Sequence, residues 1–187
     1  MNSRRTAVLG HRGIYRSSSG NYEIAYRASD TDRLIHHVCD GVCGIGIAAA
    51  ERANAEIRAL HKRGVLRDCV TSVASAADAW RLDEEARVAA GIIKQDTLRR
   101  YRQGLDQLLP LLDPPKHGGR PGRNRLLRDV FPHTVAGLID RLDAQGVTPP
   151  SRDLAISSLR NLLERAVVSG ELGYNAVDEF RRAAREA

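Results

Sequence analysis

The stretch that decides the fold is Gly13-Ile14-Tyr15-Arg16-Ser17-Ser18-Ser19-Gly20-Asn21-Tyr22-Glu23-Ile24-Ala25-Tyr26-Arg27. From Tyr22 to Arg27, large apolar residues alternate with small or charged ones, which is the period-two pattern of a half-buried strand. The serine, glycine and asparagine residues before Tyr22 favour a tight turn. Residues 13–16 and 22–27 are therefore predicted to pair as the two strands of a β-hairpin.

Outward from this hairpin, a third strand and a helix are predicted. Polar residues 29–32 favour a second turn, and Leu34-Ile35-His36-His37-Val38 after it is typical of a third antiparallel strand. Residues 47–62 are rich in alanine, glutamate and arginine and carry Ile57 and Leu60 at helical spacing. We expect a small three-stranded antiparallel sheet covered by one helix, forming a first domain of residues 1–69.

The remainder of the chain favours helices. The clearest pattern is Leu98, Tyr101, Leu105, Leu108 and Leu112, which follow the i, i+3, i+4 spacing of an amphipathic helix. Further helices are predicted over residues 72–90, 132–145, 151–168 and 175–187. Residues 114–129, which mix glycine and proline with basic residues, are expected to form a basic flexible loop. The predicted fold class is α+β, with residues 70–187 as an all-α bundle of four to five helices, coupled loosely to the sheet through residues 66–72.

Charge points to a polyanionic partner. The net charge is +6, and basic residues outnumber acidic ones by 11 to 7 in residues 1–69 and by 5 to 1 in residues 116–131. An excess of lysine and arginine attracts phosphates at long range. No apolar run approaches the roughly 18 residues of a membrane span, so no membrane partner is expected. A cytoplasmic, nucleoid-associated protein would keep Cys39, Cys43 and Cys69 reduced, and no disulfide is predicted.

Two modules of this sequence resemble those of a known family. Residues 10–65, with the hairpin sequence above, look like the arm-type DNA-binding domain that begins many phage-type tyrosine recombinases, or integrases. Thr97-Leu98-Arg99-Arg100-Tyr101-Arg102, with residues 132–142 and 151–168, is similar to the helical core-binding domain of that family. Residues 169–176 resemble its usual exit, although Asn175-Ala176 stands where Asn-Pro is usual.

The resemblance implies a DNA-binding role without catalysis. In the family a catalytic domain follows the exit and supplies an arginine, a lysine, a His-x-x-Arg pair and a tyrosine nucleophile, whereas this sequence ends at Ala187. We therefore expect no enzyme activity, no cofactor and no small-molecule substrate. The expected partners are double-stranded DNA at attachment sites and other integrase protomers. His117-Gly118-Gly119-Arg120 matches His-x-x-Arg, but a flexible loop cannot hold catalytic geometry, so chance or a phosphate contact is preferred.

Candidate DNA-binding residues follow from grouped charge. Around the sheet, Tyr22, Ile24 and Tyr26 are expected to pack on the helix, leaving Glu23, Ala25 and Arg27 toward a major groove. The candidates at the sheet are Arg12, Arg16, Arg27 and Arg33. In the bundle, the candidates for phosphate contact are Lys94, Arg99, Arg100, Arg152 and Arg160, and those for base contact are Gln103, Ser157 and Asn161.

Three alternatives stay open at this stage. His36, His37, Cys39 and Cys43 could hold zinc, but the C-x3-C spacing has no second pair, and no metal is predicted. The chain could be the N-terminal part of a complete catalytic integrase. It could also be a helical module for protein–protein interaction or oligomerisation, in which the positive charge is incidental.

Overall fold

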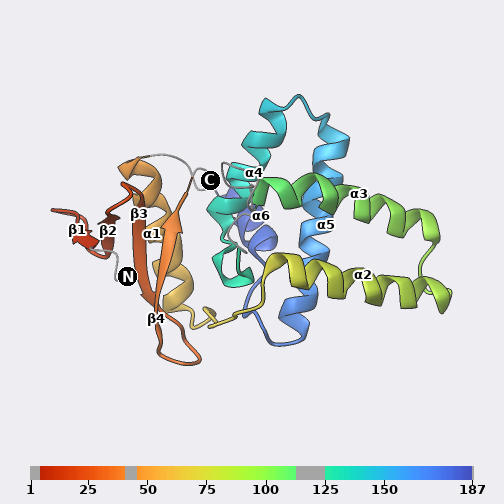
Figure 1. Ribbon diagram of the computed structural model, residues 1–187, viewed down its shortest axis with the longest axis horizontal. Coiled ribbons are helices and arrows are strands. Elements are labelled where there is room, and N and C mark those ends of the chain that lie inside the picture. The colour runs from red at the N-terminus through yellow and green to blue at the C-terminus, as the bar shows by residue number, and fades with distance from the viewer. Residues whose placement is uncertain (1–4, 41–45, 113–124, 187) are drawn as a thin grey trace.

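The computed structural model describes residues 5–40, 46–112 and 125–186. A sheet with one covering helix forms one end of the molecule, and a helical bundle forms the rest (Figure 1). The strands are β1 (Arg5–Ala7), β2 (Ile14–Ser17), β3 (Tyr22–Arg27) and β4 (Leu34–Cys39). The helices are α1 (Ile47–Lys62), α2 (Val73–Ala89), α3 (Gln95–Leu112), the short 3-10 helix η1 (Leu127–Asp129), α4 (Pro132–Ala144), α5 (Pro149–Val168) and α6 (Ala176–Glu186). The predicted α+β class is confirmed.

The sheet of the described ranges has four strands in the order β1-β2-β3-β4, so the prediction of three was wrong. The strand that the prediction did not include is β1, which pairs antiparallel with β2 from Arg5↔Ser17 to Ala7↔Tyr15. All three residues of β1 are exposed, so the strand has no buried face and no apolar alternation to reveal it. The predicted β2–β3 hairpin is confirmed by the pairing of Ile14 with Ile24.

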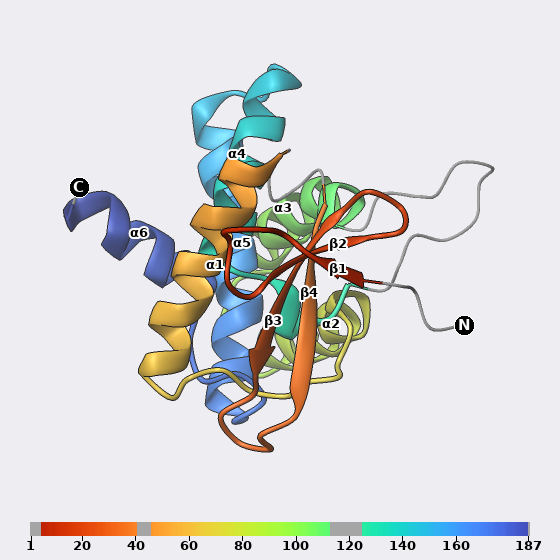
Figure 2. The same ribbon diagram turned by 90° about the vertical axis from the view of Figure 1, so that its left-hand side faces the viewer.

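The sheet packs its apolar face on α1, as the alternation of β3 predicted. Residues paired across antiparallel strands point to the same face, and Ile24 is paired with Ile14 on one side and with His37 on the other. Ile24 and Tyr26 are buried and Tyr22 is half-buried against the same core. Figure 2 views the molecule from the sheet end and shows α1 running alongside the strands.

The bundle is centred on α3 and α5. The leucines that gave α3 its periodicity are buried, with Leu98, Leu105, Leu108 and Leu112 each at most 1% exposed. The two helices approach closely at Gly104, where an added Cβ would lie 2.4 Å from Ser158 Oγ and 3.1 Å from the Ala155 Cα. Helix α2 packs beside α3, and the two extend together away from the sheet (Figure 1). The position of α3 is therefore fixed by packing on both sides.

The sheet and the bundle share one apolar core, which overturns the expectation of loose coupling. Tyr26 of β3 meets Phe131 edge-on with ring centroids 5.9 Å apart, and Leu66 in the connecting segment is buried. Arg63 at the end of α1 makes a two-pronged ion pair with Glu179 of α6, at 2.7 and 2.8 Å. The boundary between residues 69 and 70 stays a prediction, but the parts on either side of it are packed together.

The predicted loop at 114–129 falls mostly outside the described ranges, which omit residues 113–124. The residues that follow are not an exposed loop: Leu126 bridges Ser72, and Leu127 in η1 is 1% exposed. Arg125 is buried against Asp40 and also donates to the Leu112 carbonyl at 2.8 Å. Apolar Leu126-Leu127 anchors this segment, and the prediction missed it because basic residues dominate the local composition.

Candidate nucleic-acid interface

Cations and amides lie together on the outer face of α3, defined here as Arg99, Arg100, Gln103 and Gln107. These positions lie opposite the buried leucines because they are offset from them by about half a helical turn. Arg99, Arg100 and Gln103 are exposed, and Gln107 is half-buried. The structure therefore brings together three of the residues predicted to bind DNA: Arg99, Arg100 and Gln103.

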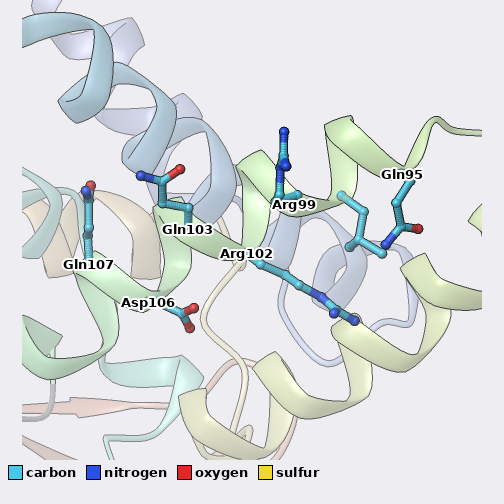
Figure 3. Close-up of a pocket in the computed structure, with 7 residues that line it drawn as sticks. Gln95, Arg99, Arg102, Gln103, Asp106 and Gln107 are labelled. Atoms are coloured by element: carbon cyan, nitrogen blue, oxygen red, sulfur yellow. The ribbon is translucent and has the colours of Figure 1, made fainter.

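A shallow groove of about 500 Å³ lies along this part of α3. It is lined by Gln95, Leu98, Arg99, Arg102, Gln103, Asp106 and Gln107. Figure 3 shows Arg99, Gln103 and Gln107 pointing to one side of the helix, whereas Arg102 and Asp106 point toward the neighbouring ribbon. Arg102 pairs with Glu85 of α2, and Asp106 pairs with Arg81 of α2 at 2.7 Å. These pairs hold α2 against α3 and leave the outer face available.

Charge on this surface is largely uncompensated. Among the described residues, neither Lys94 nor Arg100 has a carboxylate partner within ion-pair distance. Arg99 lies 3.1 Å from Asp96, but both side chains are more than three-quarters exposed, at 77% and 79%. An ion pair so exposed contributes about 0–1 kcal/mol and is readily exchanged for a phosphate. Lys94 precedes the first turn of α3, where the helix dipole also favours an anion.

The candidates on α5 are placed differently. Arg152 donates to both oxygens of Asp143, at 2.8 and 3.0 Å, and Arg160 binds Asp178 of α6 at 2.7 and 3.1 Å. These hydrogen bonds with carboxylates raise the pKa of each arginine above its usual value. Both guanidinium groups therefore serve first as links within the bundle. Ser157 is half-buried on the same helix.

Asn161 lies in a separate groove. That groove runs between α2, the start of α3 and the end of α5, beside Trp80 and Tyr101. It shares no lining residue with the groove on the outer face of α3. Sequence periodicity identified Arg160 and Asn161 as outward-facing residues of α5. It could not show that Arg160 would bind the carboxylate of Asp178.

The four sheet candidates divide into two pairs. Arg27, at the end of β3, donates to the Asp32 carbonyl at 2.7 Å and lies 3.4 Å from the Asp32 carboxylate. Arg33, just before β4, pairs at 3.2 Å with Asp68 in the segment that follows α1. Arg12 is exposed in the β1–β2 turn, and its carbonyl accepts a hydrogen bond from Asn54 at 3.2 Å. Neither Arg12 nor Arg16 has a carboxylate partner in the described residues.

Arg16 is considered separately from the other three candidate arginines at the sheet because of the sheet face on which it lies. Its partner across the hairpin is Tyr22, so it lies on the same face of the sheet as Tyr22, with its guanidinium 6.0 Å from the Tyr22 ring centroid. A cation over an aromatic ring keeps its charge available to a phosphate.

The outer sheet face is not the open DNA-reading surface that alternation suggested. Glu23, expected to face DNA, is only 6% exposed because it is covered by an ion pair with Arg5 of β1 and lies 3.7 Å from His36. Desolvation, together with the charge of Arg5, lowers the pKa of His36 despite the opposing effect of Glu23. His36 is therefore neutral at pH 7. Arg5 was missed because β1 was missed.

The remaining sequence motifs add no second site in the described ranges. No group of three or more His, Cys, Asp or Glu side chains there is arranged to hold a metal ion. Cys43 of the zinc alternative and the His117–Arg120 motif lie outside the described residues. None of the described helices combines the length and apolar character that a membrane span requires.

Comparisons with known proteins find solved structures that align with this chain, and two of them are described here. No protein-family model and no curated protein matches the chain. The crystal structure of a lambda integrase tetramer bound to a Holliday junction is 20% identical over 92% of this chain and 46% of that one, with a TM-score of 0.47. That of a lambda integrase dimer bound to a COC' core site is 20% identical over 96% and 46%, with a TM-score of 0.46. The chain thus spans about half the length of these structures.

Proposed function

We propose that this chain binds double-stranded DNA as the DNA-binding portion of a tyrosine recombinase, or integrase, and contacts attachment-site DNA through its sheet and its bundle. The observation that carries the proposal is the outer face of α3, where cations without firm carboxylate partners among the described residues stand beside exposed amides. Elsewhere in the bundle the candidate arginines Arg152 and Arg160 are already neutralised. The net charge of +6 and the sequence resemblance agree with this assignment.

The geometry of α3 suits a duplex. A major groove about 12 Å wide admits one α-helix, whose diameter with side chains is about 10–12 Å. The outer face from Arg99 to Gln107 extends about 12 Å along the helix axis at 1.5 Å per residue. Lys94, Arg99 and Arg100 would neutralise phosphates, which supplies most of the affinity. Gln103 and Gln107 would contact base edges, for which glutamine is suited by its paired donor and acceptor.

We also propose that these residues do not cleave DNA themselves. A phosphotyrosine intermediate needs an accessible tyrosine held beside cationic groups. Tyr174 is only 9% exposed, donates its hydroxyl to the Val130 carbonyl at 3.4 Å, and has its pKa raised well above the usual value by burial. A supercoiled plasmid incubated with the protein should stay supercoiled. Nicked or relaxed plasmid with a covalent protein adduct would contradict this part of the proposal.

The interface itself is tested by a matched pair of double variants. K94Q/R100Q removes two cations that lack carboxylate partners in the described ranges, and R152Q/R160Q removes two that are ion-paired. Fluorescence anisotropy with a labelled mixed-sequence duplex should show weaker binding for K94Q/R100Q, with a log–log salt slope smaller by about 2. R152Q/R160Q should keep the wild-type slope. Equal losses in both variants would show that α3 is not the DNA-binding surface.

A second candidate function is self-association. Leu82 in α2 and Ile92 in the connection between α2 and α3 are 67% and 64% exposed. Val168 at the end of α5 is 80% exposed. Exposed apolar residues can mark an interaction surface where they form a contiguous patch. Light scattering without DNA decides this: a stable oligomer that ignores duplex would favour an oligomerisation module over a DNA-binding protein.

A further inference from the structure

Three polar side chains of α3 follow one another at successive turns of the helix. Arg99, Gln103 and Gln107 are spaced four residues apart, and Figure 3 shows all three pointing to one side of α3. They line the same shallow groove. At a rise of 1.5 Å per residue, each lies about 6 Å from the next along the helix axis. The helix itself therefore sets the spacing of this row.

The two amides of the row have unused hydrogen-bonding capacity. Gln103 is exposed and Gln107 is half-buried. Neither side-chain amide forms a hydrogen bond with another protein group of the described ranges. By contrast, Arg102 and Asp106 in the same part of the helix are bound to charged groups of α2. The unused donors and acceptors therefore lie on the outer face of α3.

The chemistry of a glutamine amide selects one of the four bases. The amide places an N–H donor beside a carbonyl acceptor. In the major groove, adenine presents an acceptor at N7 beside a donor at N6, so one amide can satisfy both groups. Guanine presents two acceptors, cytosine a donor, and thymine an acceptor beside a methyl group. An amide that faces the major groove therefore favours adenine.

The packing of α3 keeps the spacing of the row constant when a ligand binds. On the opposite side of the helix, Leu105 and Leu108 are fully buried. Between them and the row, Gly104 allows α5 to approach so closely that an added Cβ would lie 3.1 Å from the Ala155 Cα. A helix fixed in this way cannot stretch or slide to adjust its contacts. Since stacked base pairs lie about 3.4 Å apart, two amides about 6 Å apart match nearly two base-pair steps.

We infer that Gln103 and Gln107 recognise adenine in two A·T pairs that are separated by one intervening base pair. Both amides can reach base edges together only when α3 lies along the floor of the major groove. One turn earlier, Arg99 would contact a phosphate and fix the register, because phosphate contacts position a protein on the duplex. This inference rests on the proposed function and adds to it the base sequence that the outer face of α3 prefers.

The first experiment is selection of bound duplexes from a random-sequence library with the whole chain. The enriched sites should share two A·T pairs with one base pair between them. Enriched sites without adenine at two positions, or with the adenines at another spacing, would overturn the inference while leaving DNA binding intact. Failure to bind any duplex at low salt would refute the proposed function, and the inference with it.

Variants assign each adenine to one glutamine. Q103A and Q107A should each lose the preference at one of the two positions and keep it at the other, by about 5- to 100-fold in relative affinity, as a bidentate contact supplies. Q145A is the matched control, because Gln145 is an exposed glutamine at the C-terminal end of α4. It should keep both preferences. A uniform loss of affinity in Q103A and Q107A, with both preferences retained, would contradict base reading by these amides.

A base analogue tests the atomic contact. In 7-deazaadenine a C–H group replaces N7, so the acceptor for the amide N–H is absent. Placed at the position assigned to Gln103, the analogue should weaken binding of the wild type and of Q107A but leave binding of Q103A unchanged. If it weakens Q103A as much as the wild type, Gln103 does not contact this base. Circular dichroism of each variant verifies that the helical content is unchanged.

Discussion

Gly104→Ala tests the packing that holds the candidate interface in place. The added Cβ would lie 2.4 Å from Ser158 Oγ, 3.1 Å from the Ala155 Cα and 3.1 Å from the Leu154 carbonyl oxygen. Ser158 is fully buried and donates its hydroxyl to the Leu154 carbonyl at 2.8 Å. The clash would therefore either push α3 from α5 or turn this hydroxyl away from its acceptor.

The magnitude follows from three contributions. Overpacking a close-packed site costs about 1–3 kcal/mol, and a buried hydroxyl left without its partner costs about 1–3 kcal/mol. Alanine gains about 1 kcal/mol over glycine in a helix interior. Since the protein can relieve the clash by one route or the other, a net loss of up to about 2 kcal/mol is expected, or up to about 8 °C in Tm for a chain of this size.

The assay is urea unfolding followed by circular dichroism, on G104A, S158A and the double variant. S158A removes the hydroxyl that the new methyl group meets, so the double variant should recover part of the loss, and the two substitutions should be coupled by about 1 kcal/mol. If G104A is more stable than the wild type by the full helix-propensity gain of about 1 kcal/mol, the close approach of α3 and α5 is not as described. Strict additivity would also refute the reasoning.

Two further substitutions probe the junction between the sheet and the bundle. Phe131→Ala removes a fully buried ring that contacts Tyr26, and the free energy of unfolding should fall by about 3–5 kcal/mol; a loss below about 1 kcal/mol would mean that the two units are not packed together. Glu179→Gln removes the ion pair with Arg63, and at pH 7 the free energy of unfolding should fall by about 0.5–1 kcal/mol, allowing for the 39% exposure of the Arg63 side chain. Because Arg63 lowers the pKa of Glu179, its stabilisation is present above the unfolded value near 4.3 and is lost as the pH falls through the lower folded value. The stabilities of the variant and the wild type should therefore converge once the pH is below the lowered folded pKa of Glu179. A difference that persists in that acidic range would assign the effect to packing.

The sequence predicted those features that repeat along the chain. The spacing of leucines in α3 identified both its buried side and its outer face, because a helix of this length presents one stripe to a core. Alternation in β3 correctly assigned Ile24 and Tyr26 to the packed side. Both are local patterns whose meaning does not depend on distant residues.

What the sequence could not predict depends on contacts between distant positions. Arg160 and Arg100 look alike as basic residues on helices, yet Asp178 neutralises only the first. Glu23 alternates outward, yet Arg5, eighteen positions earlier, covers it. The pairing of His37 with His133 joins residues 96 positions apart, and no periodicity connects them.

The most direct measurement is the salt dependence of duplex binding by the whole chain. The candidate cations without firm carboxylate partners in the described ranges, namely Arg12, Arg16, Lys94, Arg99 and Arg100, would each release about 0.9 counterion. Fluorescence anisotropy between about 50 and 200 mM salt should therefore give a linear log–log plot with a slope of about −4 to −5. No binding at the lowest salt, or binding with a slope near zero, would contradict the assignment of this chain as a DNA-binding protein.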